Sequence, residues 1–405
     1  MKILLVGGGA REHALAWKLR RDDPAAELLL APGNAGSAPV GRAVPVPATD
    51  VAALVQLATE ERPALTIIGP EGPLAAGLAD WLRDRGLAVF GPSRAAAEIE
   101  WSKGWAKAFM RRHGIPTAAF EVFDGLSEAE RYVLGQAQPP VIKDDALAGG
   151  KGVTVPDTMD DALAALRSIF ARPGARVVVE ERLLGWEVSA HALVDGQSAR
   201  LLPFSCDYKR VGDGDQGENT GGMGAYAPVQ LPAGLRRRVE EEIVRPAVAG
   251  LAAEGRPYRG LLYPGLMITA AGPRVVEFNA RFGDPETQVL LPLLASPLAP
   301  VLLACASGSL GDVDLRWHEG VCCGVVLASP GYPQAPLTVP ALALPPAEEG
   351  AAIFSAGTTG RLLTAVARGD TLPQARRRAY EILARISLPG GRYRTDIAAY
   401  DRATG

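Results

Sequence analysis

The segment from Val275 to Glu286, VVEFNARFGDPE, carries the side chains whose types and spacing most plainly predict chemistry. Its apolar, β-branched start predicts a strand, and alternate side chains of a strand share one face. Glu277 and Asn279 are therefore predicted to point the same way, and their carboxylate and amide oxygens suit Mg²⁺ or Mn²⁺. Arg281 continues on that face and adds a fixed positive charge for an anionic substrate. The alternative is an edge strand with solvated polar side chains.

A glycine-rich loop with one lysine, residues 144–152 (DDALAGGKG), follows a predicted strand at 141–143. A phosphate-binding P-loop would need glycine at 145 and serine or threonine at 152, where Asp145 and Gly152 stand. What remains is a turn whose backbone N–H groups and Lys151 could fold over phosphates. A surface hairpin is the alternative, since glycine clusters also mark ordinary turns.

Two later stretches also predict ligand contacts. Glu187 follows a predicted strand at 177–181, and a carboxylate just past a strand can accept both hydroxyls of a ribose. Residues 219–226 (NTGGMGAY) offer many backbone donors with few bulky side chains, which suits the close approach of a ligand.

Residues 1 to about 92 alternate short apolar runs with helical patterns. Strands are predicted at 2–6, 27–31, 65–68 and 87–90, and helices at 12–21, 50–60 and 74–85. Short continuous apolar strands between helices indicate a doubly wound parallel sheet with right-handed crossovers. Glycine-bearing turns follow three of the strands, and turns at the carboxyl edge of such a sheet define a ligand crevice.

That crevice does not match a dinucleotide site. Gly7 and Gly9 fit the Gly-x-Gly-x-x-Gly fingerprint, but Glu12 occupies its third glycine position. The second strand also ends without an acid for a ribose hydroxyl. A smaller phosphorylated ligand at the start of the helix remains the better expectation. His13 is expected to pack or cap rather than to act as a base.

The rest of the chain divides into two further units. Ser93 and Ser102 are predicted helix N-caps, and residues 127–130 and 371–374 have capping-box spacing. A helix is predicted over 158–170, and strands at 321–328, 352–355 and 362–367. We expect an N-terminal domain at 1–98, a central domain at 99–311 with a lid at about 117–187, and a small C-terminal α+β domain at 312–405 whose residues serve packing.

Composition excludes several classes of protein. Hydrophobic residues make up 48% and charged residues 21% of 405, which is typical of a globular chain, and a net charge of −3 excludes a general nucleic-acid surface. No apolar run reaches the length of a membrane span. The four cysteines form no Cys-x-x-Cys or His/Cys cluster, so we expect neither a zinc site nor a disulfide framework. We expect the protein in the reducing cytoplasm.

Together these segments resemble the glycinamide ribonucleotide synthetase family of the ATP-grasp superfamily. The likeness covers almost the whole chain, and its specificity comes from the order and separation of the segments. They are 7–15 (GGGAREHAL), 32–36 (PGNAG), 102–103, 141–153, 209–212 (KRVG), 219–226 and 277–288. The resemblance implies an α/β and α+β chain with an ATP-grasp fold, a doubly wound N-terminal domain and a small C-terminal domain.

The resemblance also implies a reaction. Enzymes of this family join glycine to 5-phosphoribosylamine while ATP is cleaved to ADP and phosphate, through glycyl phosphate, in de novo purine biosynthesis. Mg²⁺ or Mn²⁺ would be the cofactor and ATP a co-substrate. We expect a monomer in the cytoplasm with no nucleic-acid or membrane partner.

Site residues follow from the resemblance, position by position. For ATP they are Lys103, Lys143, Gly149, Gly150, Lys151, Glu180, Glu181, Leu183 and Glu187. For the metal they are Glu277 and Asn279. Around glycine and the reacting centre they are Asp207, Lys209, Thr220, Gly221, Gly222, Arg281, Gly283 and Asp284, of which Asp207, Lys209 and Arg281 are assigned to catalysis. For phosphoribosylamine they are Gly8, Gly9, Arg11, Glu12 and Asn34.

The chain departs from the family pattern at the lysine loop. The loop usually reads KADGLAAGKG, whereas Asp144 and Ala146 stand here in place of alanine and the first glycine. An extra acid beside a triphosphate is unfavourable unless it points away. Residues 262–266 also lack the acidic metal ligand that many ATP-grasp enzymes carry on the preceding strand, so one protein-anchored metal is expected.

Two other functions are alternatives to this ligase. One is a ligase or carboxylase of the same fold with a different acceptor, which only the segments at 219–226 and 281–286 oppose. The other is a non-catalytic nucleotide-binding module, which the presence of Glu277, Asn279 and Arg281 opposes.

Overall fold

The structure is a computed structural model that describes residues 1–146 and 152–401. Of the turn at 149–152 that was predicted to fold over phosphates, Gly149, Gly150 and Lys151 lie outside these residues. Within the described ranges, no helix is long and apolar enough to cross a membrane.

The N-terminal unit is the predicted doubly wound parallel sheet, with strand order β3-β2-β1-β4-β5. Its strands are β1 (Lys2–Gly7), β2 (Glu27–Pro32), β3 (Arg42–Ala43), β4 (Leu65–Ile68) and β5 (Val89–Phe90). Its helices are α1 (Ala10–Asp22), α2 (Val51–Glu61), α3 (Glu71–Ala75) and α4 (Leu78–Arg83). The single helix predicted at 74–85 is wrong, because Gly77 takes a φ of 84° between α3 and α4.

Two short helices, α5 (Arg94–Trp101) and α6 (Lys103–Arg112), lead into the central unit. Ser93 and Ser102 cap them as predicted, since their hydroxyls accept bonds from the backbone N–H groups of Ala96 and Trp105. Each cap satisfies an otherwise unpaired N–H at a helix start and fixes where the chain turns.

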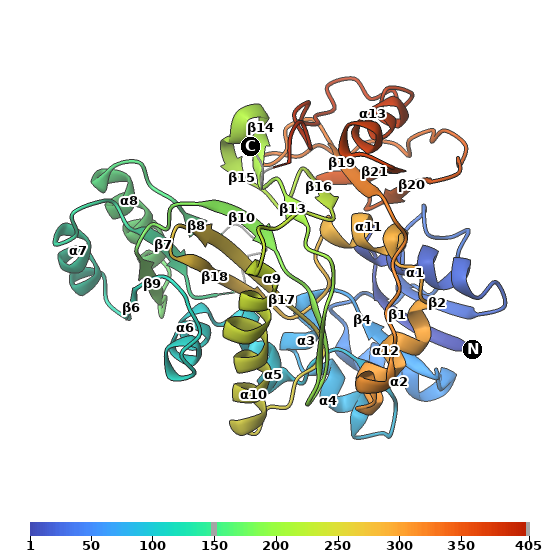
Figure 1. Cartoon of the computed structure of the whole chain (residues 1–405), viewed down its shortest axis with the longest axis horizontal. Helices are drawn as coiled ribbons and strands as arrows, with labels where there is room; N and C mark the ends of the chain where they lie inside the picture. The colour runs from blue at the N-terminus through green and yellow to red at the C-terminus, as the bar shows by residue number, and fades with distance from the viewer. Residues whose placement is uncertain (147–151, 402–405) are drawn as a thin grey trace.

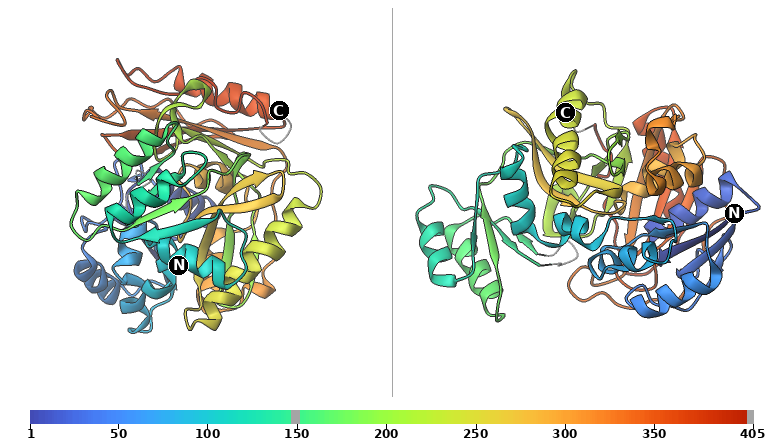
Figure 2. Two further views of the ribbon diagram at one scale, coloured as in Figure 1. Left: turned by 90° about the vertical axis from the view of Figure 1, so that its left-hand side faces the viewer. Right: turned by 90° about the horizontal axis from the view of Figure 1, so that it is seen from below.

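A lobe follows at one end of the molecule, built on the antiparallel sheet β6-β9-β7-β8 (teal and green in Figure 1). Its elements are β6 (Phe120–Phe123), α7 (Leu126–Leu134), β7 (Val141–Asp144), β8 (Val153–Thr154), α8 (Met159–Phe170) and β9 (Val177–Glu180). Both helices pack on one face of the sheet around a small separate core, and Figure 2 shows this lobe standing apart from the body. Helix α8 fits the prediction at 158–170, with Thr158 as its N-cap. Helix α7 begins at Leu126 after Gly125, so the capping box predicted at 127–130 is wrong.

The central sheet has the order β10-β17-β11-β12, with β18 paired to the other edge of β17. Its strands are β10 (Trp186–Ser189), β11 (Ala192–Asp195), β12 (Ala199–Leu201), β17 (Arg259–Thr269) and β18 (Gly272–Asn279). One continuous helical stretch precedes β17 in the chain. It is formed by α9 (Leu235–Val239), η2 (Glu240–Val244) and α10 (Arg245–Ala253).

A third sheet, β13-β16-β19-β21-β20, joins strands from either side of the boundary predicted at 311/312. Its strands are β13 (Cys206–Asp207), β16 (Gly224–Ala227), β19 (Val321–Ala328), β20 (Ala351–Ser355) and β21 (Arg361–Gly369). Around it lie β14 (Arg210–Gly212), η1 (Asp213–Asp215), β15 (Gln216–Asn219), α11 (Glu286–Leu290), η3 (Leu291–Leu293), α12 (Leu298–Ser307), η4 (Leu310–Asp312) and α13 (Leu372–Leu383). One apolar cluster includes Leu4, Phe278 and Leu327, so the core is continuous from the first sheet to this one.

Asp195 shows how a buried carboxylate ties two of these elements together. Its Oδ1 accepts from the backbone N–H groups of Gln197 and Ser198, at 3.0 and 2.7 Å, and its Oδ2 accepts from that of Leu310 at 2.9 Å. Burial alone would raise the pKa of Asp195, but these backbone donors outweigh it and hold the pKa below its usual value.

We predict that Asp195→Ala lowers the free energy of unfolding by about 1–3 kcal/mol at neutral pH, because three backbone donors lose their acceptor. The difference from wild type should shrink as the pH falls below 3.8, because the wild-type carboxylate then becomes protonated and loses its advantage. Urea unfolding of both proteins at neutral pH and below pH 3.8 measures this difference in the free energy of unfolding. Asp312→Ala, at an exposed carboxylate, is the control, and equal stability of the two variants would refute the role of Asp195.

Candidate active site

Glu277 on β18 lies in a field of positive charge. Burial would raise the pKa of its carboxyl, but Lys209, Lys143 and Lys103, with Arg281, hold that pKa below its usual value. The carboxylate therefore stays ionised at neutral pH. These cations come from four separate parts of the chain, at residues 103, 143, 209 and 281.

Glu180 anchors the lysines beneath this field. Its Oε1 lies 3.0 Å from Lys143 Nζ and its Oε2 lies 2.8 Å from Lys107 Nζ, and all three side chains are buried. Lys143 also donates to the backbone carbonyl of Val276 at 2.9 Å, which ties the lobe to β18. Burial and neighbouring Lys143 lower the pKa of Lys107 to about 8. Sequence reasoning gave Lys107 no role, because its i,i+4 spacing from Lys103 is also that of a solvated helix face.

The metal ligands predicted from the sequence fit a magnesium ion bound mainly by substrate. Glu277 supplies an ionised oxygen, and Asn279 supplies an amide oxygen that also accepts a bond from Arg281 Nη2 at 2.9 Å. A carbonyl oxygen has a second lone pair for a metal. Among the described residues, no group of three or more His, Cys, Asp or Glu side chains could hold a metal ion by itself. One or two protein oxygens completed by phosphates and water are the usual magnesium arrangement.

Arg281 is held between two acids that sequence reasoning missed. Its Nε lies 3.5 Å from Glu71 of α3 and 3.3 Å from Glu100 of α5. Burial would lower the pKa of Arg281, but Glu100 and Glu71 outweigh it and raise the pKa. Glu100 also accepts from the backbone N–H of Ala280 at 2.9 Å, which fixes the turn after β18. Glu71 lies in one of the glycine-bearing turns that follow the strands of the first sheet, but its side chain was given no role there, and no motif marked Glu100.

The C-terminal unit reaches the site through Arg361 of β21. Arg361 Nη2 lies 2.9 Å from the Asp284 carboxylate, and Nη1 donates to the Gly221 carbonyl at 2.6 Å. The unit expected to serve mostly packing therefore also contacts residues of the candidate site. Gly222 has a φ of 107°, and a Cβ there would collide with Pro285, so this close approach of two loops requires glycine.

Lys209, Glu187 and Asp207 lie together, although the resemblance assigns Glu187 to ATP and the other two residues to the reacting centre. Lys209 Nζ is 2.6 Å from Glu187 and 4.0 Å from Asp207. Thr220 donates to the Lys209 carbonyl at 2.8 Å and accepts from the Gly222 N–H at 3.0 Å, so the glycine-rich stretch is anchored beside the lysine.

Asp207 belongs to a buried polar network. Its Oδ1 accepts from Ser189 Oγ at 3.3 Å, Ser189 Oγ lies 2.8 Å from Tyr263 Oη, and Tyr263 donates to Glu286 Oε1 at 2.7 Å. Fully buried His191 stacks on Tyr263 with ring centroids 4.3 Å apart. Burial and nearby Asp207 raise the pKa of Glu286 to about 7. Burial also raises the pKa of Asp207, so both acids of this network favour their protonated forms more than solvated carboxyl groups do.

The N-terminal crevice brings together the residues predicted for phosphoribosylamine. Asn34 Nδ2 donates to the Gly8 carbonyl, and Glu12 accepts from the Gly9 N–H, each at 2.8 Å. Arg11 pairs with Glu12 at 2.6 Å and donates to the Phe282 carbonyl at 3.1 Å. The crevice is therefore bonded directly to the turn that carries Arg281.

His13 is a packed residue, as expected. Its Nδ1 accepts from the Ser355 N–H at 2.9 Å, and burial lowers its pKa to about 4. The side chain is therefore neutral at physiological pH.

Family models match three stretches of the chain. They describe the phosphoribosylglycinamide synthetase N domain at residues 1–100, its ATP-grasp (A) domain at 101–287 and its C domain at 322–400. Among curated relatives, the phosphoribosylamine–glycine ligase of Agrobacterium fabrum is 46% identical, over 98% of each chain. That of Chlorobaculum tepidum is 44% identical, over 98% of this chain and 99% of the relative.

Solved structures agree with these matches. A phosphoribosylamine–glycine ligase from Thermotoga maritima superposes with a TM-score of 0.85 at 34% identity, over 98% of this chain and 100% of the other. A biotin carboxylase from Campylobacter jejuni has a TM-score of 0.72 at 15% identity, over 100% of this chain and 94% of the other, which shows a shared fold alone. The chain belongs to the phosphoribosylglycinamide synthetase family, and its fold is the ATP-grasp fold.

Proposed function

We propose that this protein ligates glycine to 5-phosphoribosylamine with cleavage of ATP to ADP and phosphate, giving glycinamide ribonucleotide for purine biosynthesis. The observation that carries the proposal is the ionised Glu277 surrounded by Lys103, Lys143 and Lys209. An acid among lysines is a metal and triphosphate site, and relatives aligned over nearly the whole chain are named phosphoribosylamine–glycine ligases.

The chemistry explains why the site is built from charge. A carboxylate is a poor electrophile, because its oxygen is a poor leaving group. Transfer of the γ-phosphoryl group of ATP to glycine gives glycyl phosphate, which the ribosyl amine attacks with release of phosphate. Phosphoryl transfer asks a protein for positioning and charge neutralisation. Lys103 and Lys143 would neutralise the phosphates of ATP, and Arg281 would stabilise the negative charge on the transferred group.

Magnesium fits the oxygens of Glu277 and Asn279, and when bound it would offset charge on the phosphates. The chain's own part is to keep Glu277 ionised, through the three lysines, and to orient Asn279 through Arg281. Arg281 in turn is fixed by Glu71 and Glu100, so the ligand positions are set before substrates arrive.

The attacking amine must lose a proton as the amide forms. Asp207 and Glu286, joined through Ser189 and Tyr263, would take up that proton, because their pKa values are raised toward neutrality. Glycine would lie beside Lys209 and residues 220–222, and phosphoribosylamine in the crevice formed by Gly8, Gly9, Arg11, Glu12 and Asn34.

We also propose the division into domains at 1–98, 99–311 and 312–405, a monomer, and a cytoplasmic location. All four cysteines are buried, and Cys305, Cys322 and Cys323 are free thiols, which favours a reducing compartment.

Release of ADP measured with each substrate omitted tests the function. Release that needs both glycine and phosphoribosylamine supports this ligase. Release that needs neither, or release supported by a different acceptor, points to the other ligases of the fold, and no release at all points to a binding module.

We predict that Glu277→Ala abolishes magnesium-dependent ADP release, with kcat/KM reduced about 100-fold or more, since metal-assisted charge stabilisation contributes several kcal/mol. Steady-state kinetics over a range of Mg²⁺ concentrations measures this loss, and circular dichroism checks the fold. Glu218→Gln, at an exposed acid on β15, is the matched control. Activity retained in Glu277→Ala would overturn the metal assignment.

A second prediction concerns Asp144, the extra acid of the lysine loop. Its carboxylate pairs with Arg172 at 2.7 Å, so its charge is matched before ATP binds. Arg172→Gln should raise the KM for ATP about two- to fivefold, equivalent to roughly 0.5–1 kcal/mol, because the acid is then left unpaired near the phosphates. The double variant Arg172→Gln/Asp144→Ala should restore KM. A KM that the second substitution does not restore would contradict this account.

A third prediction concerns the buried acid Glu286. Its pKa is raised from 4.5 to about 7, so ionisation costs stability that grows between these pH values and is fully present above pH 7. Glu286→Gln keeps an acceptor for Tyr263 and should raise the free energy of unfolding by on the order of 1–3 kcal/mol above pH 7, with little change near pH 4.5. Urea unfolding at both pH values measures this gain. Exposed Glu241→Gln is the control, and a gain equal at both pH values would contradict the prediction.

A further inference from the structure

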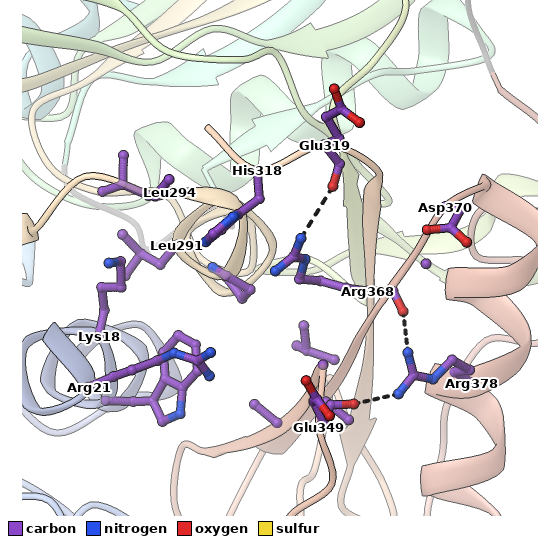
Figure 3. Close-up of a pocket in the computed structure, with 18 of the residues that line it drawn as sticks. Lys18, Arg21, Leu291, Leu294, His318, Glu319, Glu349, Arg368, Asp370 and Arg378 are labelled. Atoms are coloured by element: carbon purple, nitrogen blue, oxygen red, sulfur yellow. Dashed lines mark hydrogen bonds between the residues drawn. The ribbon is translucent and has the colours of Figure 1, made fainter. Parts of the chain in front are cut away.

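A second cavity lies away from the candidate active site, where α1 meets the C-terminal sheet (Figure 3). Its volume is about 790 Å³, within the range of roughly 300–1,000 Å³ that small-molecule sites occupy. The last turn of α1, the loop after η3, and the facing ends of β20 and β21 form its walls, with the start of α13 at one side. None of the residues assigned above to ATP, glycine or phosphoribosylamine lines it.

Positive groups gather on one side of this cavity. Figure 3 shows the nitrogen atoms of Arg21, His318 and Arg368 turned toward the same hollow, with Lys18 beside them. Partial burial lowers the pKa of His318, and the charges of Arg368, Lys18 and Arg21 lower it further. Three cations from α1 and β21 therefore act on one imidazole from the segment between η4 and β19.

The guanidinium groups are oriented by neutral partners. Arg368 Nη2 donates to the backbone carbonyl of Glu319 at 3.2 Å, whereas the Glu319 carboxylate points away from Arg368 in Figure 3. Arg21 lies over the Trp17 ring, 5.4 Å from its centroid. Across residues 1–146 and 152–401, neither arginine forms an ion pair with a carboxylate. Their charges are thus positioned without being neutralised.

The other charged groups of the cavity are arranged differently. Lys18 is buried and paired with Asp22, so it contributes to the field without being available as a direct ligand. Arg378 donates to the carbonyls of Arg368 and Glu349, at 2.7 and 2.6 Å, and lies with exposed Glu349 and Asp370 toward α13. The cavity therefore has a cationic side made of Arg21, His318 and Arg368, and a mixed side near α13.

We propose that this cavity binds a phosphate-bearing small molecule, whose phosphate is held by Arg21 and Arg368 with His318 as a third donor. Arginine forks match phosphate oxygens in bidentate geometry, and an imidazole between two arginines is easily protonated once an anion neutralises them. The site is distinct from the ATP and phosphoribosylamine positions and does not depend on the proposed reaction.

The cavity shares helix α1 with the N-terminal crevice. Helix α1 begins with Arg11 and Glu12 at the crevice and ends with Arg21 and Asp22 at the cavity. A ligand bound here would therefore contact both the N-terminal unit, through α1, and the C-terminal sheet, through β21. Such a ligand would stabilise their contact by mass action.

Equilibrium dialysis of the full-length protein with radiolabelled inorganic pyrophosphate tests the proposal. Wild type should bind pyrophosphate, and Arg21→Gln/Arg368→Gln should bind it at least about tenfold more weakly, the equivalent of one charge-assisted contact. Arg237→Gln/Arg377→Gln removes the same charge from two exposed arginines outside the cavity and should bind as wild type does. Lys143→Met removes a cation of the candidate active site and should also retain binding.

A second measurement stands without the double variant. Bound pyrophosphate should raise the pKa of His318, because a neighbouring anion favours the imidazolium form. Imidazole NMR titration, with the signal assigned by His318→Asn, reads this shift. The proposal is overturned if wild type binds no pyrophosphate, if binding is lost in Lys143→Met but kept in Arg21→Gln/Arg368→Gln, or if the His318 pKa is unchanged by pyrophosphate.

Discussion

The buried contact of Glu180 with Lys107 and Lys143 is the interaction on which the site depends. It places two ammonium groups in the protein interior, where an unpaired charge would be strongly unfavourable. One carboxylate with two lysines leaves a net positive charge. Lys143 donates a hydrogen bond to the carbonyl of Val276, next to Glu277, and its charge lowers the pKa of Glu277. The bond from Lys143 to Val276 therefore joins the lobe to the central sheet, and the same lysine supplies positive charge for an anion.

The rest of the site repeats this pattern of paired charges that hold loops. Arg281 lies between Glu71 and Glu100, and Arg361 joins Asp284 to the glycine-rich stretch. Arg281 connects the turn after β18 to the N-terminal unit and to α5, and Arg361 connects the C-terminal unit to Asp284 and Gly221. The residues of the candidate site therefore lie where the three units meet. The buried acids Asp207 and Glu286 differ from these pairs, because burial favours their protonated forms and prepares them to exchange a proton.

Much of this could be predicted from the sequence. Apolar runs predicted the parallel sheet of the first unit, and Ser93 and Ser102 predicted the starts of α5 and α6, because both signals are local in the sequence. Glu277 and Asn279 were predicted because their alternate spacing on a strand puts both side chains on one face, whereas Lys209 was assigned through the family resemblance. Glu71, Glu100 and Arg361 were missed because their roles arise only when distant segments meet. Glu71 even lies in a glycine-bearing turn of the predicted crevice, but that signal concerned the backbone of the turn and not the carboxylate. The break at Gly77 was missed because one glycine within a helical pattern is often tolerated.

The third sheet sets an order on events during synthesis of the chain. Strand β16 ends at Ala227, but its hydrogen-bonding neighbour β19 begins at Val321, about 100 residues later. At roughly 5–20 residues per second, a ribosome takes on the order of 5–20 s to supply that neighbour. During this interval the nascent protein carries an unpaired strand edge, which makes it a candidate client for chaperones that shield such edges.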